Sequence, residues 1–332
     1  MTSALQTKPI ALVLGATGGI GGAVARTLVA RGWTVRALNR TAGANRDPSF
    51  TWIRGDAMER GDVLAAAQGA RLIVHAVNPP GYRNWDELVL PMLDNTIAAS
   101  LATGATVLLP GTVYNFGPDS FPLLTEDAPQ NPKSEKGKIR VDMERRLHSA
   151  CAEKGLRAIV VRAGDFFGPQ AANNWFSQGM VTPQKPVTGV MYPGSQGVGH
   201  QWAYLPDVAE TMVRLVERGT RLPAFAVYHM QGFWDATGTG MIEAIGRAAG
   251  RTKLIVRHFP WWVIPFASPF SVFMRELKEM RYLWQQPLRM PNDRLVAELG
   301  FEPHTPIDEA VTATLAGLGC LPENEEELAR AA

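Results

Sequence analysis

The sequence predicts an α/β fold in which a doubly wound parallel sheet carries helices on both faces. Short apolar runs alternate with helical patterns through the first half of the 332 residues, and a glycine-rich turn joins the first run to the first helix. Strict alternation of this kind is typical of βαβ units, whose strands pair in parallel. After residue 168 the alternation loosens, so we expect a smaller C-terminal α/β lobe to complete the fold.

Five runs in the first half have the length and composition of buried strands. They are residues 10–14, 34–38, 72–76, 106–109 and 158–162. Two intervening segments, "GGAVARTLVARG" and "DVLAAAQG", have apolar residues at helical spacing and end in a glycine, the usual residue just after a helix. The first domain is therefore predicted to span residues 1–168, with 200–230 returning to it, and the second lobe to comprise 169–199 and 231–332.

Composition and charge exclude several classes of protein. The 33 Lys and Arg against 31 Asp and Glu give a net charge of +2 without a long basic stripe, so neither nucleic acid nor a membrane is an expected partner. Cys151 and Cys320 stand far apart, with no CxxC pair and no zinc-ligand spacing, which predicts no metal site and a reduced, cytoplasmic chain. The short polar start leads into the apolar run 10–14, which is too brief for the hydrophobic region of a secretion signal, so no secretion is expected.

The most apolar stretch is "FPWWVIPFASPFSVFM", residues 259–274. Three prolines interrupt it, and it is shorter than the roughly 20 residues that a membrane-spanning helix needs. We expect a buried, proline-broken connection. A lid over a substrate and a partner-binding surface are the alternatives.

The segment "ALVLGATGGIGG" gives the strongest functional signal. Because glycine has no Cβ, such a turn lets the backbone approach a pyrophosphate, and the next helix supplies N–H groups and a favourable dipole. Its place between a strand and a helix predicts a dinucleotide site. The residues expected to contact the cofactor are Gly15, Thr17, Gly18, Gly19, Ile20 and Gly21.

The end of the second strand distinguishes the two nicotinamide dinucleotides. A carboxylate there binds the ribose hydroxyls of NAD, whereas an arginine accommodates the 2′-phosphate of NADP. The chain has Asn39 and Arg40 and no acid, which favours NADP(H) over NAD(H). The alternative is that Arg40 is an ordinary surface residue.

The ends of later strands offer further cofactor contacts. Asp56, followed by Ala57, faces the adenine or instead caps the next helix, with Glu59 completing a capping box. Three residues of "HAVNPP" are expected at the cofactor edge of the sheet: Ala76, Val77 and Asn78. His75 is expected to be a packed strand residue.

Together these segments and five later ones resemble the short-chain dehydrogenase/reductase superfamily, in its extended NAD-dependent epimerase/dehydratase branch. The later segments are "PGTVYNFGP", "LTEDAPQNP", "VVRAGDFFGP", "WAYLPDVAETM" and "LVAELGFEPHTPIDEAVTATL". The resemblance covers most of the chain and implies a Rossmann fold. It also implies cofactor contacts from Ala163 and Asp165.

The family's first catalytic segment is altered in this chain. In the family, a Ser or Thr four residues before the Tyr of a VYG segment orients the substrate oxygen, and a later Tyr and Lys, four residues apart, transfer the proton. Here Pro110 lies four residues before Tyr114, so that hydroxyl is absent. Thr112 is the candidate to replace it. Tyr114 is itself a candidate proton donor, although the family uses this tyrosine structurally.

The stretch "NPKSEKGKIRVDME", residues 131–144, comes just before an expected helix and keeps the frame of the family's PxSxYGxxKxxxE pattern. The residues that keep their places are Pro132, Ser134, Gly137 and Glu144. Lys136 then occupies the tyrosine position and Arg140 the lysine position. An alternative register keeps Lys138 as the lysine and puts Ser134 at the tyrosine position. Both registers lack the catalytic tyrosine, which predicts an atypical member.

The two replacements suggest different chemistry. Arg140 is a fixed fork of donors that suits ribose hydroxyls or a phosphate. Lys136 is a candidate general acid or base, a role that lysine takes where desolvation and neighbouring cations lower its pKa. The alternative is that Lys136 is a solvated loop residue.

Aromatic and amide side chains after the fifth predicted strand indicate a substrate pocket. They are Asn173, Asn174, Trp175, Phe176, His200, Gln201, Trp202 and Tyr204. Such walls suit a small, partly apolar compound with hydroxyl or carbonyl oxygens. A lone histidine such as His200 is more often structural than catalytic.

These residues predict an NADP-dependent reductase or dehydrogenase of a small carbonyl or hydroxyl compound, with Lys136 or Tyr114 handling the proton. Two alternatives stay open. One is a non-catalytic NADP-binding redox sensor or scaffold, which the missing tyrosine favours, and the other is a sugar-type epimerase or dehydratase. The resemblance also implies a homodimer formed through helices near residues 91–101 and 139–152.

Overall fold

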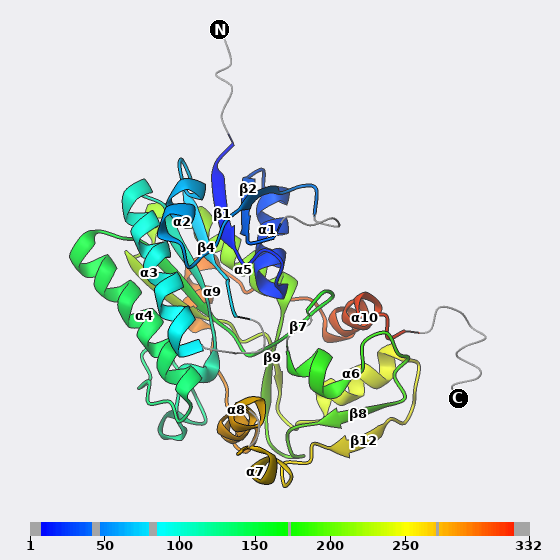
Figure 1. The fold of residues 1–332 in the computed structure, drawn as a ribbon. Coiled ribbons are helices and arrows are strands. Elements are labelled where there is room, and N and C mark those ends of the chain that lie inside the picture. Colours follow the sequence, from blue (N-terminus) through cyan, green and yellow to red (C-terminus); the bar gives the residue numbers. More distant parts are fainter. Residues whose placement is uncertain (1–7, 42–46, 80–84, 172–173, 270–271, 322–332) are drawn as a thin grey trace. The chain divides into compact units, whose positions relative to one another are not determined.

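A computed structural model of the chain describes residues 8–41, 47–79, 85–171, 174–269 and 272–321 (Figure 1). The chain forms two compact units. Unit 1 comprises residues 1–110, 142–160 and 209–227, and unit 2 comprises 111–141, 161–208 and 228–332. The domain boundaries inferred from the sequence stay a prediction, because compactness alone does not show which segments bind a cofactor or a substrate.

The central sheet has seven strands in the order β10-β6-β5-β4-β1-β2-β3. They are β1 (Ile10–Leu14), β2 (Thr34–Asn39), β3 (Thr51–Arg54), β4 (Leu72–His75), β5 (Thr106–Gly111), β6 (Ala158–Arg162) and β10 (Phe225–His229). The ladders joining β1 to β2 and β4, β2 to β3, and β4 to β5 are parallel. The predicted fold class is confirmed, and each predicted strand is present within two residues of its expected ends.

The central strands are apolar on both faces because helices cover both. Leu12, Val13 and Ile73 are fully buried, and each such side chain stabilises the fold by about 1.5–3 kcal/mol. The flanking helices are α1 (Gly19–Ala30), α2 (Arg60–Ala66), α3 (Trp85–Thr103), α4 (Glu135–Lys154) and α5 (Leu205–Arg218). Figure 1 shows α2 and α3 on one face of β1 and β4, and α1 on the other. Arg31 at the end of α1 forms an ion pair with Glu210 of α5.

The described part of unit 2 adds a three-stranded sheet of order β11-β9-β7 and a two-stranded sheet of β12 and β8. These strands are β7 (Asp165–Phe167), β8 (Gly189–Tyr192), β9 (His200–Tyr204), β11 (Phe233–Asp235) and β12 (Ile255–His258). The helices are α6 (Gly240–Ala248), α7 (Ile264–Ala267), α8 (Val272–Met280), α9 (Asp293–Leu299) and α10 (Ile307–Gly317). Helix α6 packs against α10, and Phe167, Phe176 and Trp202 lie in one buried core.

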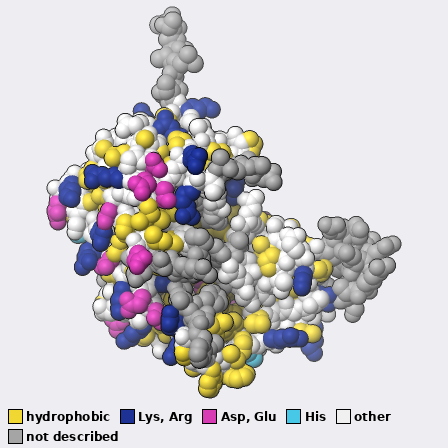
Figure 2. Space-filling view, viewed as in Figure 1, with side chains coloured by type: hydrophobic (Ala, Val, Ile, Leu, Met, Phe, Trp, Pro, Cys, Tyr) yellow, Lys and Arg dark blue, Asp and Glu magenta, His cyan; other side chains and the backbone are white. Residues whose placement is uncertain are grey.

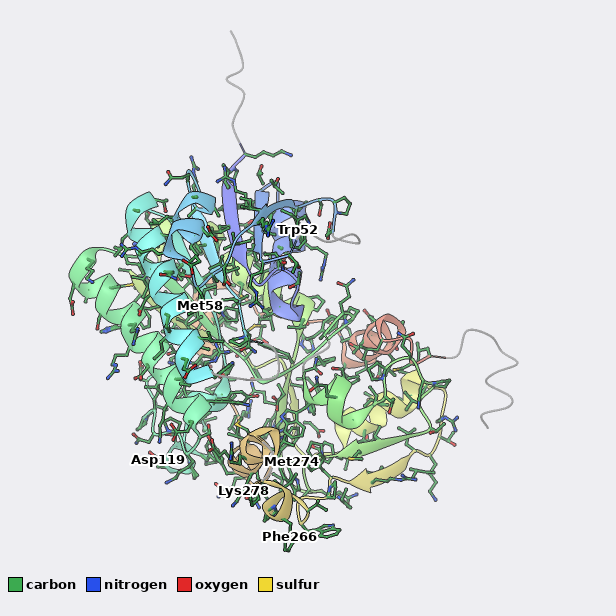
Figure 3. The ribbon with its side chains drawn as sticks, viewed as in Figure 1. Trp52, Met58, Asp119, Phe266, Met274 and Lys278 are labelled. Atoms are coloured by element: carbon green, nitrogen blue, oxygen red, sulfur yellow. The ribbon has the colours of Figure 1, made fainter. Side chains whose placement is uncertain are left out.

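The proline-broken segment 259–274 is only partly buried, which corrects the expectation of a buried connection. Ile264 is 3% exposed, but Trp262 is 73% exposed and Phe266 is 75% exposed. Figure 3 shows the side chain of Phe266, a residue of α7, pointing away from the ribbon, and Figure 2 shows hydrophobic side chains gathered in the same region. Helix α7 is four residues long, about one turn, so only one of its sides packs against the core.

Candidate functional site

The glycine turn of unit 1 brings backbone segments closer than a side chain would allow. Gly15 has a φ of +92°, and a Cβ there would lie 2.4 Å from the carbonyl oxygen of Ala76. A Cβ on Gly21 would lie 2.2 Å from the carbonyl oxygen of Gly15. These approaches hold α1 against the carboxyl ends of β1 and β4. The residues present therefore fit the cradle that a dinucleotide requires.

The N-terminus of α1 is suited to an anion. Gly18 is the N-cap, no side chain caps the helix, and the first turn holds no acidic residue. Thr17 and Gly18 are exposed, and Gly19 and Ile20 are partly exposed. The N–H groups of a first helical turn lack partners within the helix, and the helix dipole adds positive potential, so this end favours a phosphate.

The end of β2 presents an arginine to solvent. The Asn39 Oδ1 atom accepts hydrogen bonds from the backbone N–H and the hydroxyl of Thr41, at 3.0 and 3.1 Å. Arg40 is exposed, and its guanidinium makes no hydrogen bond or ion pair with any residue in the described ranges. Such a group is free to pair with a phosphate.

The capping box proposed for Asp56 and Glu59 is wrong. Glu59 is itself the N-cap of α2 and makes no side-chain capping bond. The Asp56 carboxylate instead accepts a hydrogen bond from the backbone N–H of Met58 at 3.0 Å, because the chain turns locally before the helix begins. Ala57 is buried, and its carbonyl oxygen accepts from Asn95 at 2.9 Å. A contact between Asp56 and adenine stays a prediction.

The end of β4 is well ordered by hydrogen bonds. His75 is a packed strand residue, as expected: it is 2% exposed, and its Nδ1 atom lies 2.8 Å from the Thr96 hydroxyl. Ala76 donates its N–H to the β1 backbone, and the Asn78 Oδ1 atom accepts from the Trp85 indole at 2.8 Å. Val77, between them, is partly exposed. All predicted cofactor residues as far as Asn78 therefore belong to unit 1.

Unit 2 contains the altered catalytic segments. Thr112 is the N-cap of a short 3₁₀ turn, η2 (Val113–Asn115), and its hydroxyl accepts a hydrogen bond from the backbone N–H of Tyr114 at 3.2 Å. Both side chains are partly exposed. The hydroxyl of Thr112 thus supports its own turn, and a role in orienting a substrate stays a prediction.

The charged stretch 131–144 was expected just before a helix, but most of it lies inside α4. The helix begins at Glu135, and the buried Ser134 hydroxyl accepts from the Gly137 N–H at 3.1 Å. A Cβ on Gly137 would lie 2.3 Å from the carbonyl oxygen of Tyr114. The first turn of α4 therefore lies close to the Tyr114 backbone, and within that turn Lys136 is only 8% exposed. The alternative of Lys136 as a solvated loop residue is therefore wrong.

The neighbouring cations differ from Lys136. Lys138 has a side chain that is 59% exposed, and its ammonium pairs with Glu135 at 2.6 Å. Arg140 is partly exposed, and Glu144, one turn further along α4, is buried at 5% exposure.

Tyr282, which the sequence did not indicate as a site residue, packs against the residues just before α4. Tyr282 lies in a 3₁₀ turn, η6 (Arg281–Trp284), and its hydroxyl donates to the carbonyl oxygen of Phe116 at 3.0 Å. Burial raises the pKa of Tyr282 to about 12, against the opposite effect of hydrogen bonds with the Lys133 backbone and the Ser134 hydroxyl. No local pattern relates Tyr282 to Ser134, because only tertiary packing brings them together.

Asp165 and His200 form a pair that the sequence also missed. The His200 Nε2 atom donates to the Asp165 carboxylate at 2.8 Å, and the two side chains are 8% and 12% exposed. The pairing of β7 with β9 brings them together. Asp165 was expected to contact a cofactor and His200 to stand alone. Ala163 is buried, and Asn173 lies outside the described residues.

Residues 11–229 match the NAD dependent epimerase/dehydratase family. The chain belongs to this family. The "Uncharacterized protein y4nL" of Sinorhizobium fredii is 29% identical over 191 residues, which are 51% of this chain and 54% of that protein. A 3-diazoavenalumate denitrifying reductase of Streptomyces is 29% identical over 174 residues, 48% of this chain and 56% of that protein. The chain thus spans about half the length of these family relatives.

The fold is also that of solved epimerase structures. The UDP-glucose 4-epimerase from Brucella ovis, solved in complex with NAD, has a TM-score of 0.72 and 16% identity, with 94% of this chain and 98% of that chain covered. This similarity shows the shared fold and no more. In the described part of the chain, none of the helices has the length and hydrophobicity that a membrane crossing requires, and no three His, Cys, Asp or Glu side chains gather as metal ligands.

Proposed function

We propose that this family member is an NADP-dependent reductase or dehydrogenase of a small carbonyl or hydroxyl compound. The observation that carries the proposal is the burial of Lys136 at the position where the resemblance expects the acid/base tyrosine. The 29% identity to a reductase supports redox chemistry.

The cofactor preference rests on Arg40. Family membership supports a nicotinamide dinucleotide, which when bound exchanges a hydride with the substrate. The turn around Gly15 and Gly18 would hold its pyrophosphate through backbone N–H groups. Arg40, exposed and unpaired among the described residues, would bind the 2′-phosphate that distinguishes NADP.

The proton is assigned to Lys136. Lys136 is a buried amine, and an amine at this position can act as a general acid toward a substrate oxygen. Lys138 is exposed and paired with Glu135, and this difference supports the register with Lys136 at the tyrosine position and Arg140 at the lysine position. Arg140 would then bind a ribose hydroxyl or a phosphate. Tyr114 is the second candidate for the proton, and Thr112 for orienting the substrate.

A test is the oxidation of NADPH with a panel of carbonyl compounds. We expect turnover by the wild type, a loss of about 100-fold or more in kcat for Lys136→Met, and a change of less than about twofold for the exposed control Lys138→Met. Tight NADPH binding without turnover across the panel would overturn the enzyme assignment in favour of the redox sensor. Equal activity of the two variants would remove Lys136 from the mechanism.

The proposal also covers the oligomeric state of the protein and its location in the cell. We propose a homodimer, on the resemblance alone, and light scattering should then give twice the chain mass of 36.2 kDa. A mass of one chain would reject it. The free, buried thiols of Cys151 and Cys320 support a reducing, cytoplasmic location.

A further inference from the structure

Unit 2 encloses the Asp165–His200 pair in aromatic rings. The His200 ring stacks on Trp284, with centroids 3.7 Å apart and planes 8° apart, and meets Trp202 at 5.0 Å and 64°. Tyr192 packs edge-on against the same Trp284 ring at 5.9 Å. These four rings are each at most 6% exposed. They form one buried cluster, called the aromatic cluster below.

Two donors in the aromatic cluster have no acceptor. The Tyr192 hydroxyl and the Trp202 Nε1 atom are buried without a hydrogen-bond partner among the described residues. A buried donor without an acceptor costs stability, so such a pair needs an explanation. A Cβ on Gly194 or Gly238 would lie 3.1 or 3.2 Å from the Tyr192 hydroxyl oxygen. The two glycines thus leave the hydroxyl free of crowding side chains.

His200 adds a third polar atom. Its Nε2 atom is held by Asp165, and its Nδ1 atom has no hydrogen-bond partner in the described part of the chain. The carboxylate therefore fixes the orientation of the imidazole and leaves the second nitrogen for another group.

Nearby charges select a neutral ligand. Burial raises the pKa of Tyr192, and the Asp235 and Asp165 carboxylates raise it further, so the hydroxyl stays protonated and can donate. The same carboxylates would repel an anion in a site of low dielectric. The ring faces of the tryptophans and His200 favour a flat, conjugated partner.

We propose that the aromatic cluster binds an aromatic aldehyde or ketone. Its carbonyl oxygen accepts from the Tyr192 hydroxyl and the Trp202 indole N–H. Its ring takes the place of Trp284 against His200. Trp284 ends the four-residue turn η6, so it can move without breaking a strand or a long helix. This inference goes beyond the proposed function: it names the ligand class of the aromatic cluster and assigns no step of the reaction to it.

The test is calorimetric titration of the full chain without a dinucleotide. The probes are 2-acetonaphthone, the non-aromatic cyclohexyl methyl ketone and the anion 2-naphthoate. We expect 2-acetonaphthone to bind, and the other two to bind at least about tenfold more weakly. Absence of 2-acetonaphthone binding up to its solubility limit would overturn the proposal.

Two variants remove a donor and keep a ring. Tyr192→Phe and Trp202→Phe should each weaken 2-acetonaphthone binding about fivefold, the effect of one lost neutral hydrogen bond. The thermal unfolding midpoint of Tyr192→Phe should equal or exceed that of the wild type, because the Tyr192 hydroxyl has no hydrogen-bond partner to lose among the described residues. Trp262→Phe, at an exposed position, is the matched control and should bind as the wild type does. Unchanged affinity in both donor variants would show that the ketone does not bind through these donors, and would reject the site.

The two proposals fail in different ways. Ketone binding without any NADPH oxidation would reject the proposed function and leave the site intact. NADPH oxidation by other carbonyl compounds, without 2-acetonaphthone binding, would reject only the site.

Discussion

The glycine turn of unit 1 and the aromatic cluster of unit 2 depend on opposite features of the chain. The turn depends on missing side chains, because a Cβ on Gly15 or Gly21 would collide with backbone atoms. The cluster depends on large side chains: His200 and Trp202 of β9 pack with Trp284, which comes from a distant segment. A short local pattern thus defines the turn that the family shares. Long-range packing defines the cluster, where this chain can differ from its relatives.

The largest effect is expected at the turn. Gly15→Ala should lower the free energy of unfolding by about 2–4 kcal/mol, because the left-handed backbone strains an alanine and its Cβ overlaps the Ala76 carbonyl. Gly32→Ala is the matched control: its φ is +82°, but a Cβ there meets nothing within 4 Å. Its loss should be only about 1–2 kcal/mol. Urea unfolding measures both, and equal losses would show that the close approach has no energetic importance.

In unit 2, packing keeps a histidine neutral. Burial, and then the Arg162 guanidinium, lower the pKa of His229 to about 3. Arg162 donates to the His229 Nε2 atom at 3.0 Å, and the Nδ1 atom donates to the Leu124 carbonyl at 3.1 Å. In the unfolded chain the His229 imidazole binds a proton near pH 6.5, whereas in the native protein it stays neutral at that pH. Stability should therefore be full above pH 6.5 and fall by about 2 kcal/mol on acidification to pH 5.

The variant His229→Gln should remove this part of the pH dependence, measured as the slope of the free energy of unfolding between pH 7 and 5. His148→Gln, at an exposed position, should keep the wild-type slope. An unchanged slope in His229→Gln would place the acid sensitivity elsewhere.

The smallest effect is expected at an exposed ion pair of unit 2. Arg247 of α6 pairs with Asp308 of α10 at 2.7 Å, with side chains 53% and 56% exposed. Solvent screens such a pair, so Arg247→Gln should cost less than about 1 kcal/mol. A double-mutant cycle with Asp308→Asn measures the coupling. A coupling above about 2 kcal/mol would mean that surface charge contributes to the lobe as strongly as core packing does.

The fold and the turn follow from sequence because their signals are local. Alternating strands and helices, and glycines directly after β1, need no knowledge of distant contacts. The sequence also indicates that Ser134 and Gly137 keep their places in the family's catalytic pattern. It does not indicate that Lys136 is buried. A run of cations normally indicates solvation, and tertiary packing, which buries Lys136 and leaves Lys138 exposed, cannot be inferred from that local pattern.

The pairs that sequence reasoning missed share one cause. Asp165 meets His200 through the pairing of β7 with β9, and Tyr282 reaches Phe116 from the far end of the chain. Short, irregularly spaced strands in unit 2 give no pattern from which their partners can be predicted. The capping box predicted for Asp56 and Glu59 is wrong for a local reason: the Asp56 carboxylate accepts a hydrogen bond from Met58 within its own turn.

The dissociation constants of NADPH and NADH, measured for the wild type and for Arg40→Gln, test the cofactor assignment most directly. We expect the wild type to bind NADPH at least about tenfold more tightly, and Arg40→Gln to lose that preference, because the 2′-phosphate then lacks its charged hydrogen bond. Equal or tighter binding of NADH by the wild type, unchanged in Arg40→Gln, would contradict the assignment.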